Sequence, residues 1–198
     1  MKGTWKIINN VLKNKTDVHN ATEMKIGEKM ENDSSVIAEG FNDFFVNVGP
    51  ELANKIPSTQ KTFHSFLHNS NFESLFFAPT DEQEILNIIK KLKKKNSAGF
   101  DEISNNLLKN IAPEIIKPLE YIFNLSLING IVPQNMKIAK VIPIFKKGDP
   151  LECSNYRPIS LLSSFSKILE KIIYVRTVTF LQKHNIFLET QFGFREKH

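Results

Sequence analysis

The sequence predicts an α+β fold that is mostly helical, with a small antiparallel sheet in the last third of the chain. Apolar residues recur at spacings of three and four in several segments that begin at capping residues, which is typical of amphipathic helices. β-Branched residues are concentrated in residues 138–145, which favours a strand. The chain has 198 residues, 41% of them hydrophobic, so it can bury a core, and no apolar run approaches the ~20 residues of a membrane span.

The first 79 residues are predicted to contain helices joined by irregular segments. Residues 4–12 place apolar side chains at helical spacing, whereas residues 13–32 are polar without periodicity and are interpreted as a linker. Ser34 is predicted to cap a longer helix, which the glycine and proline at 49–50 interrupt. Residues 58–78 contain scattered phenylalanines and are predicted to be irregular.

Residues 80–99 are predicted to form a capped helix followed by a break. The Thr-Asp-Glu-Gln sequence of residues 80–83 is a capping box, and apolar residues as far as Leu92 share one face. The opposite face carries the lysine run of residues 90–95, and a glycine ends the break at 96–99. This run could contact a nucleic-acid backbone, but a solvated helix face explains it equally well.

Two more helices are predicted before the sheet. The first begins at Ser104 and ends at Ile111, and the second opens with Pro113 at a first-turn position and stops at Gly130. The strand of residues 138–145 follows, in which a proline indicates an edge strand or a bulge.

The predicted strand is followed by a turn at residues 146–150 and a return strand at 159–162. Ser163 or Ser164 is then predicted to cap a long helix that ends near residues 184–185, before a short extended tail.

Charge and cysteine content give weak information about partners and compartment. The net charge of +5 favours an acidic partner such as nucleic acid, although a lysine-rich solvated surface explains it as well. The chain has one cysteine, Cys153, and no apolar stretch of a signal peptide follows the basic residues at its start. Both observations predict an intracellular protein of the cytoplasm or nucleus. The five histidines show no metal-ligand spacing with Cys153, so no zinc site is predicted.

The predicted hairpin carries the side chains that are best suited to binding phosphate. Lys146 and Arg157 lie on its neighbouring segments, Gly148 permits the turn and Pro158 stiffens the chain beside the arginine. A lysine is a mobile point charge and an arginine is a planar bidentate donor, so the pair could bind phosphate. Judged from these residues alone, a basic turn with a structural arginine is the competing interpretation.

Four segments in order resemble the reverse transcriptases of LINE-type (non-LTR, Jockey-like) retrotransposons. They are residues 96–101, residues 123–133, the pair 141–150 with 154–162, and the Gln-Phe-Gly-Phe-Arg sequence of residues 191–195. Each is short, but four in the right order outweigh the competing interpretation. The segments around Trp5 and Phe41 resemble, less specifically, the region before the polymerase in the same elements.

The resemblance implies a fold and a domain division. The chain would be the fingers part of a right-hand polymerase, with the palm truncated. Residues 1–79 would be a pre-polymerase helical segment with linkers, and residues 80–198 would be the N-terminal part of the reverse transcriptase domain.

The resemblance also implies roles for particular residues. Lys146 and Arg157 match positions that contact the triphosphate of the incoming dNTP. Residues 191 and 195 match a block beside the template and primer, although ordinary solvated side chains explain them nearly as well. The candidate nucleic-acid-binding residues are Lys147, Gln191, Arg195, Lys94 and Lys95.

The sequence departs from the resemblance at two places. Phe100 and Glu102 stand where proline and glycine are usual around Asp101, which leaves the conformation of that loop open. These polymerases also hold two Mg²⁺ ions on palm aspartates, whereas the six aspartates of this chain are never adjacent. The resemblance therefore implies that the metal ligands are absent, that the chain holds no cofactor and that the chain alone is inactive.

The predicted function is a part of an RNA-directed DNA polymerase that would bind template RNA, an RNA–DNA hybrid and incoming dNTP. The alternative is a non-enzymatic nucleic-acid-binding or helix-docking module that was left after loss of the polymerase. The sequence leaves open whether the chain is a decayed copy, a piece of a longer protein or a retained module. Target-site preference, oligomeric state and the stability of the isolated chain are also open.

Overall fold

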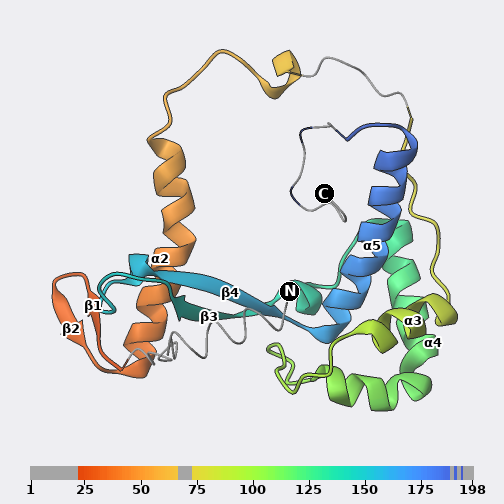
Figure 1. Ribbon diagram of the computed structural model, residues 1–198, viewed down its shortest axis with the longest axis horizontal. Coiled ribbons are helices and arrows are strands. Elements are labelled where there is room, and N and C mark those ends of the chain that lie inside the picture. The colour runs from red at the N-terminus through yellow and green to blue at the C-terminus, as the bar shows by residue number, and fades with distance from the viewer. Residues whose placement is uncertain (1–21, 67–72, 188–189, 191–192, 194–198) are drawn as a thin grey trace, which may run out of the picture. The chain divides into compact units, whose positions relative to one another are not determined.

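The computed structural model describes residues 22–66, 73–187, 190 and 193 (Figure 1). The predicted α+β class is confirmed, because helices predominate and the strands form two small sheets. In chain order the elements are β1 (Met24–Ile26), β2 (Lys29–Glu31), α2 (Ser34–Asn54), η1 (Phe63–Phe66), α3 (Glu82–Lys91), α4 (Asn105–Asn129), η2 (Gln134–Lys137), β3 (Ala139–Phe145), η3 (Cys153–Asn155), β4 (Tyr156–Leu162) and α5 (Ser164–Lys183). None of the described helices is long and apolar enough to cross a membrane.

The described residues form two compact units. The first contains the residues up to Ser58 together with Ile142–Ile159, and the second contains Thr59–Val141 together with the residues from Ser160 onward. The first unit therefore holds β1, β2, α2 and the turn end of the β3–β4 hairpin, and the second holds α3, α4 and α5.

The first unit begins with a hairpin that the sequence did not predict. Strands β1 and β2 pair antiparallel, with Met24 opposite Glu31 and Ile26 opposite Lys29. The two-residue turn between them starts at Gly27, whose φ of +64° is a backbone conformation that glycine adopts without strain. The linker prediction for residues 13–32 is therefore wrong for residues 24–31, because three-residue strands are too short to show alternation.

Helix α2 begins one residue earlier than predicted, because Ser34 is its first residue and not its cap, and it ends later. Its N-cap is Asp33, whose side chain accepts hydrogen bonds from the backbone N–H of Ser35 (2.8 Å) and Val36 (3.2 Å). The predicted interruption at residues 49–50 is wrong, since the helix continues through Pro50 to Asn54. Pro50 is exposed, so the backbone carbonyl that loses its helical donor there can bind water instead.

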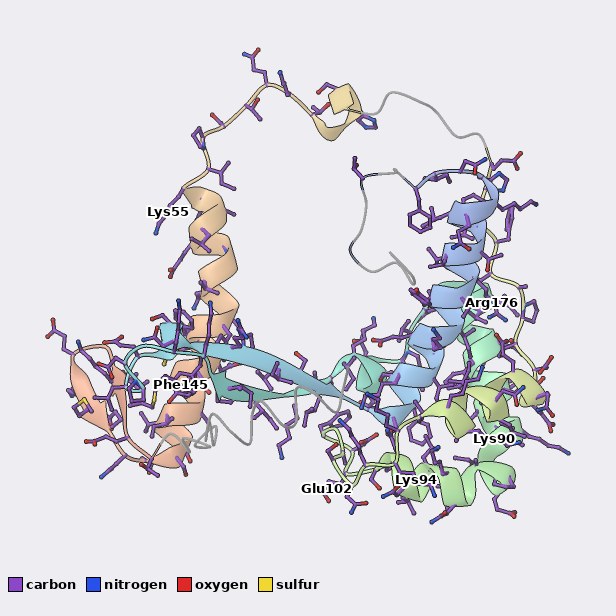
Figure 2. The ribbon with its side chains drawn as sticks, viewed as in Figure 1. Lys55, Lys90, Lys94, Glu102, Phe145 and Arg176 are labelled. Atoms are coloured by element: carbon purple, nitrogen blue, oxygen red, sulfur yellow. The ribbon has the colours of Figure 1, made fainter. Side chains whose placement is uncertain are left out.

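Aromatic contacts hold α2 against the turn end of the β3–β4 hairpin. Phe41 meets the ring of Tyr156 edge-on at 4.9 Å between centroids, and Phe145 meets Tyr156 at 5.4 Å. Met24 and Ile37 are buried in the same cluster. Figure 2 shows Phe145 at this contact, on the side of the hairpin that faces α2. Such edge-on pairs add to the stabilisation from burial itself.

The second unit is a three-helix core. Buried apolar side chains from α3, α4 and α5 meet in one cluster: Ile85, Ile89, Leu108, Ala112, Ile116, Leu119, Phe123, Leu127, Ile168, Leu169 and Ile172. Each large apolar side chain that is buried this way stabilises the fold by about 1.5–3 kcal/mol relative to an exposed one.

Helix α4 is a single helix, and the prediction of two helices around Pro113 is wrong. Ser104 is the predicted N-cap and accepts from the backbone N–H of Leu107 at 3.2 Å, and Gly130 ends the helix with a φ of +66°. Pro113 and Pro118 both lie on the exposed side of the helix. The buried side is therefore undisturbed, and its packing outweighs the loss of two helical hydrogen bonds.

Helix α3 is shorter than predicted at its C-terminal end. Its N-cap is Asp81 and not Thr80, so the predicted capping box is one residue out of register. Asp81 accepts from the backbone N–H of Glu84 at 2.7 Å, and the helix ends at Lys91. Residues 93–95 follow the helix, so the prediction that the whole lysine run lies on one helix face is wrong.

The last third follows the predicted order. Strand β4 starts at Tyr156, three residues before the predicted return strand at residue 159. Ser163 is the N-cap of α5 and accepts from the backbone N–H of Phe165 at 3.2 Å, and α5 ends at Lys183 close to the predicted position. The helix predicted at residues 4–12 lies outside the described residues.

Candidate functional site

The β3–β4 hairpin places Lys146 and Arg157 on the same face. The backbone N–H of Lys146 donates to the carbonyl of Asn155 at 2.9 Å, and the rings of Phe145 and Tyr156 contact each other across the strands. Because successive side chains of a strand point to opposite faces, the neighbours Lys146 and Arg157 both lie on the face away from these rings. Their exposure agrees, since both are exposed whereas Tyr156 is buried.

Residues 146–155 connect the two strands, and local hydrogen bonds brace this connection. The Asp149 carboxylate accepts from the backbone N–H of Leu151 at 2.9 Å, and the Asn155 amide donates to the Asp149 carbonyl at 3.0 Å. Gly148 has a φ of +97°, and a Cβ there would lie 2.8 Å from the Asn155 amide nitrogen. Glycine is therefore required at position 148 for two reasons: the positive φ, and the lack of space for a Cβ.

Tyr156 anchors the start of β4 to the same connection. Its hydroxyl donates to the carbonyl of Pro150 at 2.8 Å, while its ring is buried against Phe41. Burial raises the pKa of Tyr156, and the nearby Cys153 and Asp149 act in the same direction, so the hydroxyl keeps its proton and its donor role. The roles of Tyr156 and Asn155 were not predicted from the sequence, although the Asp-Pro pair at residues 149–150 favours a turn.

The basic side chains at this end of the hairpin are exposed and uncompensated. No described acidic residue forms an ion pair with Lys146, Lys147 or Arg157. Two or three cations on a braced hairpin can together bind an oligophosphate, with the arginine as the bidentate donor.

The other candidate binding residues are not part of this cluster. Lys94 and Lys95 are exposed in the loop between α3 and α4, and they belong to the second unit. Figure 2 labels Lys94 and Glu102, which both belong to that loop. Gln191 and Arg195 lie outside the described residues.

The loop between α3 and α4 is fixed to the start of α5. Gly99 is buried there, and a Cβ on it would lie 2.8 Å from the backbone nitrogen of Ser163. The Asp101 carboxylate accepts from the Ser163 hydroxyl at 2.6 Å and from the backbone N–H of Ile103 at 3.2 Å. Glu102 has a φ of +58°, so the loop keeps a left-handed conformation at the position where the resemblance has glycine.

The structure supplies no metal centre in the part of the chain that it describes. No group of three or more histidine, cysteine, aspartate or glutamate side chains there is arranged to hold an ion.

Curated proteins that are similar to this chain come from transposable elements. The chain is 39% identical over 126 residues to "Probable RNA-directed DNA polymerase from transposon BS" of Drosophila melanogaster, which covers 63% of this chain. It is 35% identical over 121 residues to "RNA-directed DNA polymerase from mobile element jockey" of Drosophila funebris, which covers 61%. The chain is homologous to a segment of such polymerases.

These comparisons confirm the predicted resemblance to non-LTR retrotransposon reverse transcriptases. The matched region spans only 13–14% of the length of the two polymerases described above. No family model matches the chain.

Proposed function

We propose that this chain acts as part of an RNA-directed DNA polymerase and that the turn end of its β3–β4 hairpin binds the triphosphate of the incoming dNTP. The observation that carries the proposal is the placement of Lys146 and Arg157 on one exposed face of a braced hairpin. The homologous polymerases support the reaction class.

The bracing of the hairpin matters because it fixes the backbone beside the cations before a ligand arrives. The hydrogen bonds of Asp149, Asn155 and Tyr156 hold both strand ends. Binding then requires ordering of the long side chains but not of the loop, which lowers the entropic cost of association.

The experiment is a chimeric polymerase in which this chain replaces the homologous segment of the jockey enzyme. Arg157→Ala should raise the KM for dNTP and slow incorporation, because a charge-assisted contact to phosphate is lost. Such a contact contributes about 1.5–3 kcal/mol, so kcat/KM should fall by roughly tenfold to a hundredfold. Lys146→Ala should act in the same direction with a smaller effect, since a lysine makes a less demanding contact.

Two further variants make the experiment specific. Arg157→Lys should recover only part of the loss, because an ammonium cannot reproduce the two parallel bonds of a guanidinium. Lys117→Ala removes an exposed charge from α4 and should leave the KM for dNTP unchanged. If Arg157→Ala and Lys146→Ala leave dNTP kinetics intact and only lower thermal stability, the two residues are structural and the proposal fails.

We also propose that template RNA or an RNA–DNA hybrid contacts the remaining candidate residues, four cations and one glutamine. The candidates are Lys147, Lys94, Lys95, Gln191 and Arg195, and the positions of the last two rest on the resemblance alone. Binding of a single-stranded RNA should weaken as salt rises, with each phosphate contact contributing roughly 0.7 to the logarithmic slope. Replacing Lys94 and Lys95 together by glutamine should lower that slope, and affinity that does not depend on salt would contradict this assignment.

A further inference from the structure

A groove in the second unit lies between α3 and α5, and none of the residues that line it has a role in the proposed function. Its cavity volume is about 650 Å³. Ile88 and Leu92 from the α3 side and Val175 from α5 form its apolar wall. Ligand pockets of small organic molecules have volumes of about 300–1,000 Å³, so the groove has the size of such a pocket.

Three lysines surround this apolar wall. Lys91 lies in the last turn of α3, and Lys167 and Lys171 lie one turn apart on α5. Residues four apart share a helix face, so the two α5 lysines can meet the same ligand. The Lys171 ammonium lies 4.4 Å from the centre of the Tyr174 ring, in a cation–π contact with its neighbour on the helix.

The acidic residues of the groove do not neutralise these lysines. Asp81 caps α3, and both oxygens of Glu84 are bound by the Arg176 guanidinium at 3.0 and 2.9 Å. The hydrogen bond from Arg176 lowers the pKa of Glu84 below its ordinary value of 4.5, so its charge is committed to the arginine. Across the described ranges, no acidic side chain forms an ion pair with Lys91, Lys167 or Lys171.

We propose that the α3–α5 groove is a binding site for a small amphiphilic anion, an apolar body that carries one acidic group. The apolar body would cover Ile88, Leu92 and Val175, and the acidic group would meet the lysines on the rim. A neutral apolar molecule would gain nothing from the three charges, and a purely polar anion would leave the apolar wall in water. The site is independent of the hairpin, which belongs to the other unit apart from its open end.

Two dyes of similar shape, one anionic and one uncharged, test the site on the whole chain. The anion 8-anilinonaphthalene-1-sulfonate should bind with a saturable fluorescence increase at one site. Its uncharged analogue N-phenyl-1-naphthylamine should bind that site about tenfold more weakly or worse, because it lacks the charge-assisted contact.

Variants then locate the binding. Lys167→Gln combined with Lys171→Gln should weaken sulfonate binding about tenfold, while Lys117→Gln on α4 should leave it unchanged. Val175→Asp places a repelling carboxylate in the groove, and the fold should accept it because Val175 is 41% exposed. Circular dichroism of each variant should match that of the parent chain, which separates loss of the site from loss of the fold.

Three results would overturn the proposal. One is equal affinity for the two dyes, and another is an unchanged sulfonate affinity in the double lysine variant. The third is displacement of the bound dye by an oligothymidylate, which would assign the lysines to nucleic acid. An oligothymidylate that leaves the dye in place supports the amphiphile site, whether or not the hairpin binds nucleotide.

Discussion

The hairpin connection at residues 146–155 and the loop between α3 and α4 both hold a residue in the left-handed conformation, and they do so through different contacts. Each contains a residue with left-handed φ, Gly148 at +97° in the first and Glu102 at +58° in the second. Beside Gly148 the connection is held by near neighbours in sequence, Asn155 and Asp149, and farther along by the backbone N–H of Lys25, which donates to the Leu151 carbonyl at 3.0 Å. The loop is held by a hydrogen bond from the Ser163 hydroxyl to the Asp101 carboxylate, and these two residues are 62 positions apart in the sequence.

The difference shows what each region demands of its sequence. The hydrogen bonds next to Gly148 come from Asn155, whose side chain also crowds the glycine, so this left-handed position has no room for a Cβ. A loop that is braced from a distant helix start can hold a residue that is strained there, because the tertiary contact fixes the backbone. Substitutions in both regions test this comparison.

The largest effect is expected for Gly99→Ala, at the contact that fixes the loop. The new Cβ would lie 2.8 Å from the Ser163 nitrogen and 3.0 Å from the Leu162 carbonyl carbon, and neither backbone atom can move without shifting α5. The free energy of unfolding in urea should fall by about 2–3 kcal/mol. Gly49→Ala is the matched control, since no atom lies within 4 Å of its would-be Cβ, and a similar loss there would refute the steric explanation.

Asp101→Ala should have the next largest effect, because it removes the distant brace itself. The Ser163 hydroxyl and the backbone N–H of Ile103 would both lose their acceptor. A loss of about 1.5–2 kcal/mol in the same urea titration is expected. Asp101→Asn keeps an oxygen for the Ile103 N–H and should cost less, so equal losses for the two variants would show that the Ile103 bond contributes little.

Gly148→Ala should destabilise the hairpin connection by about 1–2 kcal/mol. Its φ of +97° suits glycine alone, and the new Cβ would also press on the flexible Asn155 side chain. Gly27→Ala separates these causes, because Gly27 has a φ of +64° with nothing within 4 Å. A smaller cost at Gly27 is expected, and no cost at Gly148 would mean that the connection is not held as tightly as its hydrogen bonds indicate.

The smallest effect, of opposite sign, is expected for Glu102→Gly. Relief of the left-handed strain contributes about 1–2 kcal/mol, and the extra freedom of glycine in the unfolded chain offsets part of it. The net gain in unfolding free energy should be about 0.5–1 kcal/mol. Glu102→Ala keeps the strain and should give no gain, so a gain with alanine would trace the effect to the side chain instead.

The parts of the fold that the sequence could predict are those with local signals. Ser104 and Ser163 cap the helices as predicted, and Gly130 ends α4 where expected. The missed parts depend on information that is not local. Pro113 fails to end α4 because the helix buries its other side, and β1 and β2 are too short for alternation to appear.

The candidate site shows the same limit. The types of Lys146 and Arg157 and the turn at Gly148 suggested phosphate binding from sequence. Their common face depends on the pairing register, which the contacts of Asn155 and Tyr156 set. The sequence can predict which residue types could bind phosphate, whereas the pairing register of the two strands, which puts those residues on one face, requires the structure.

The left-handed Glu102 also has a genetic consequence. Glutamate codons become glycine codons by a single A-to-G change at the second base, so the strained and relaxed forms of this loop are one nucleotide apart. A copy of the gene that gained glutamate here would keep its fold, because Asp101 and Ser163 hold the loop in either case. Such a copy would carry a small stability deficit that one reverse base change removes.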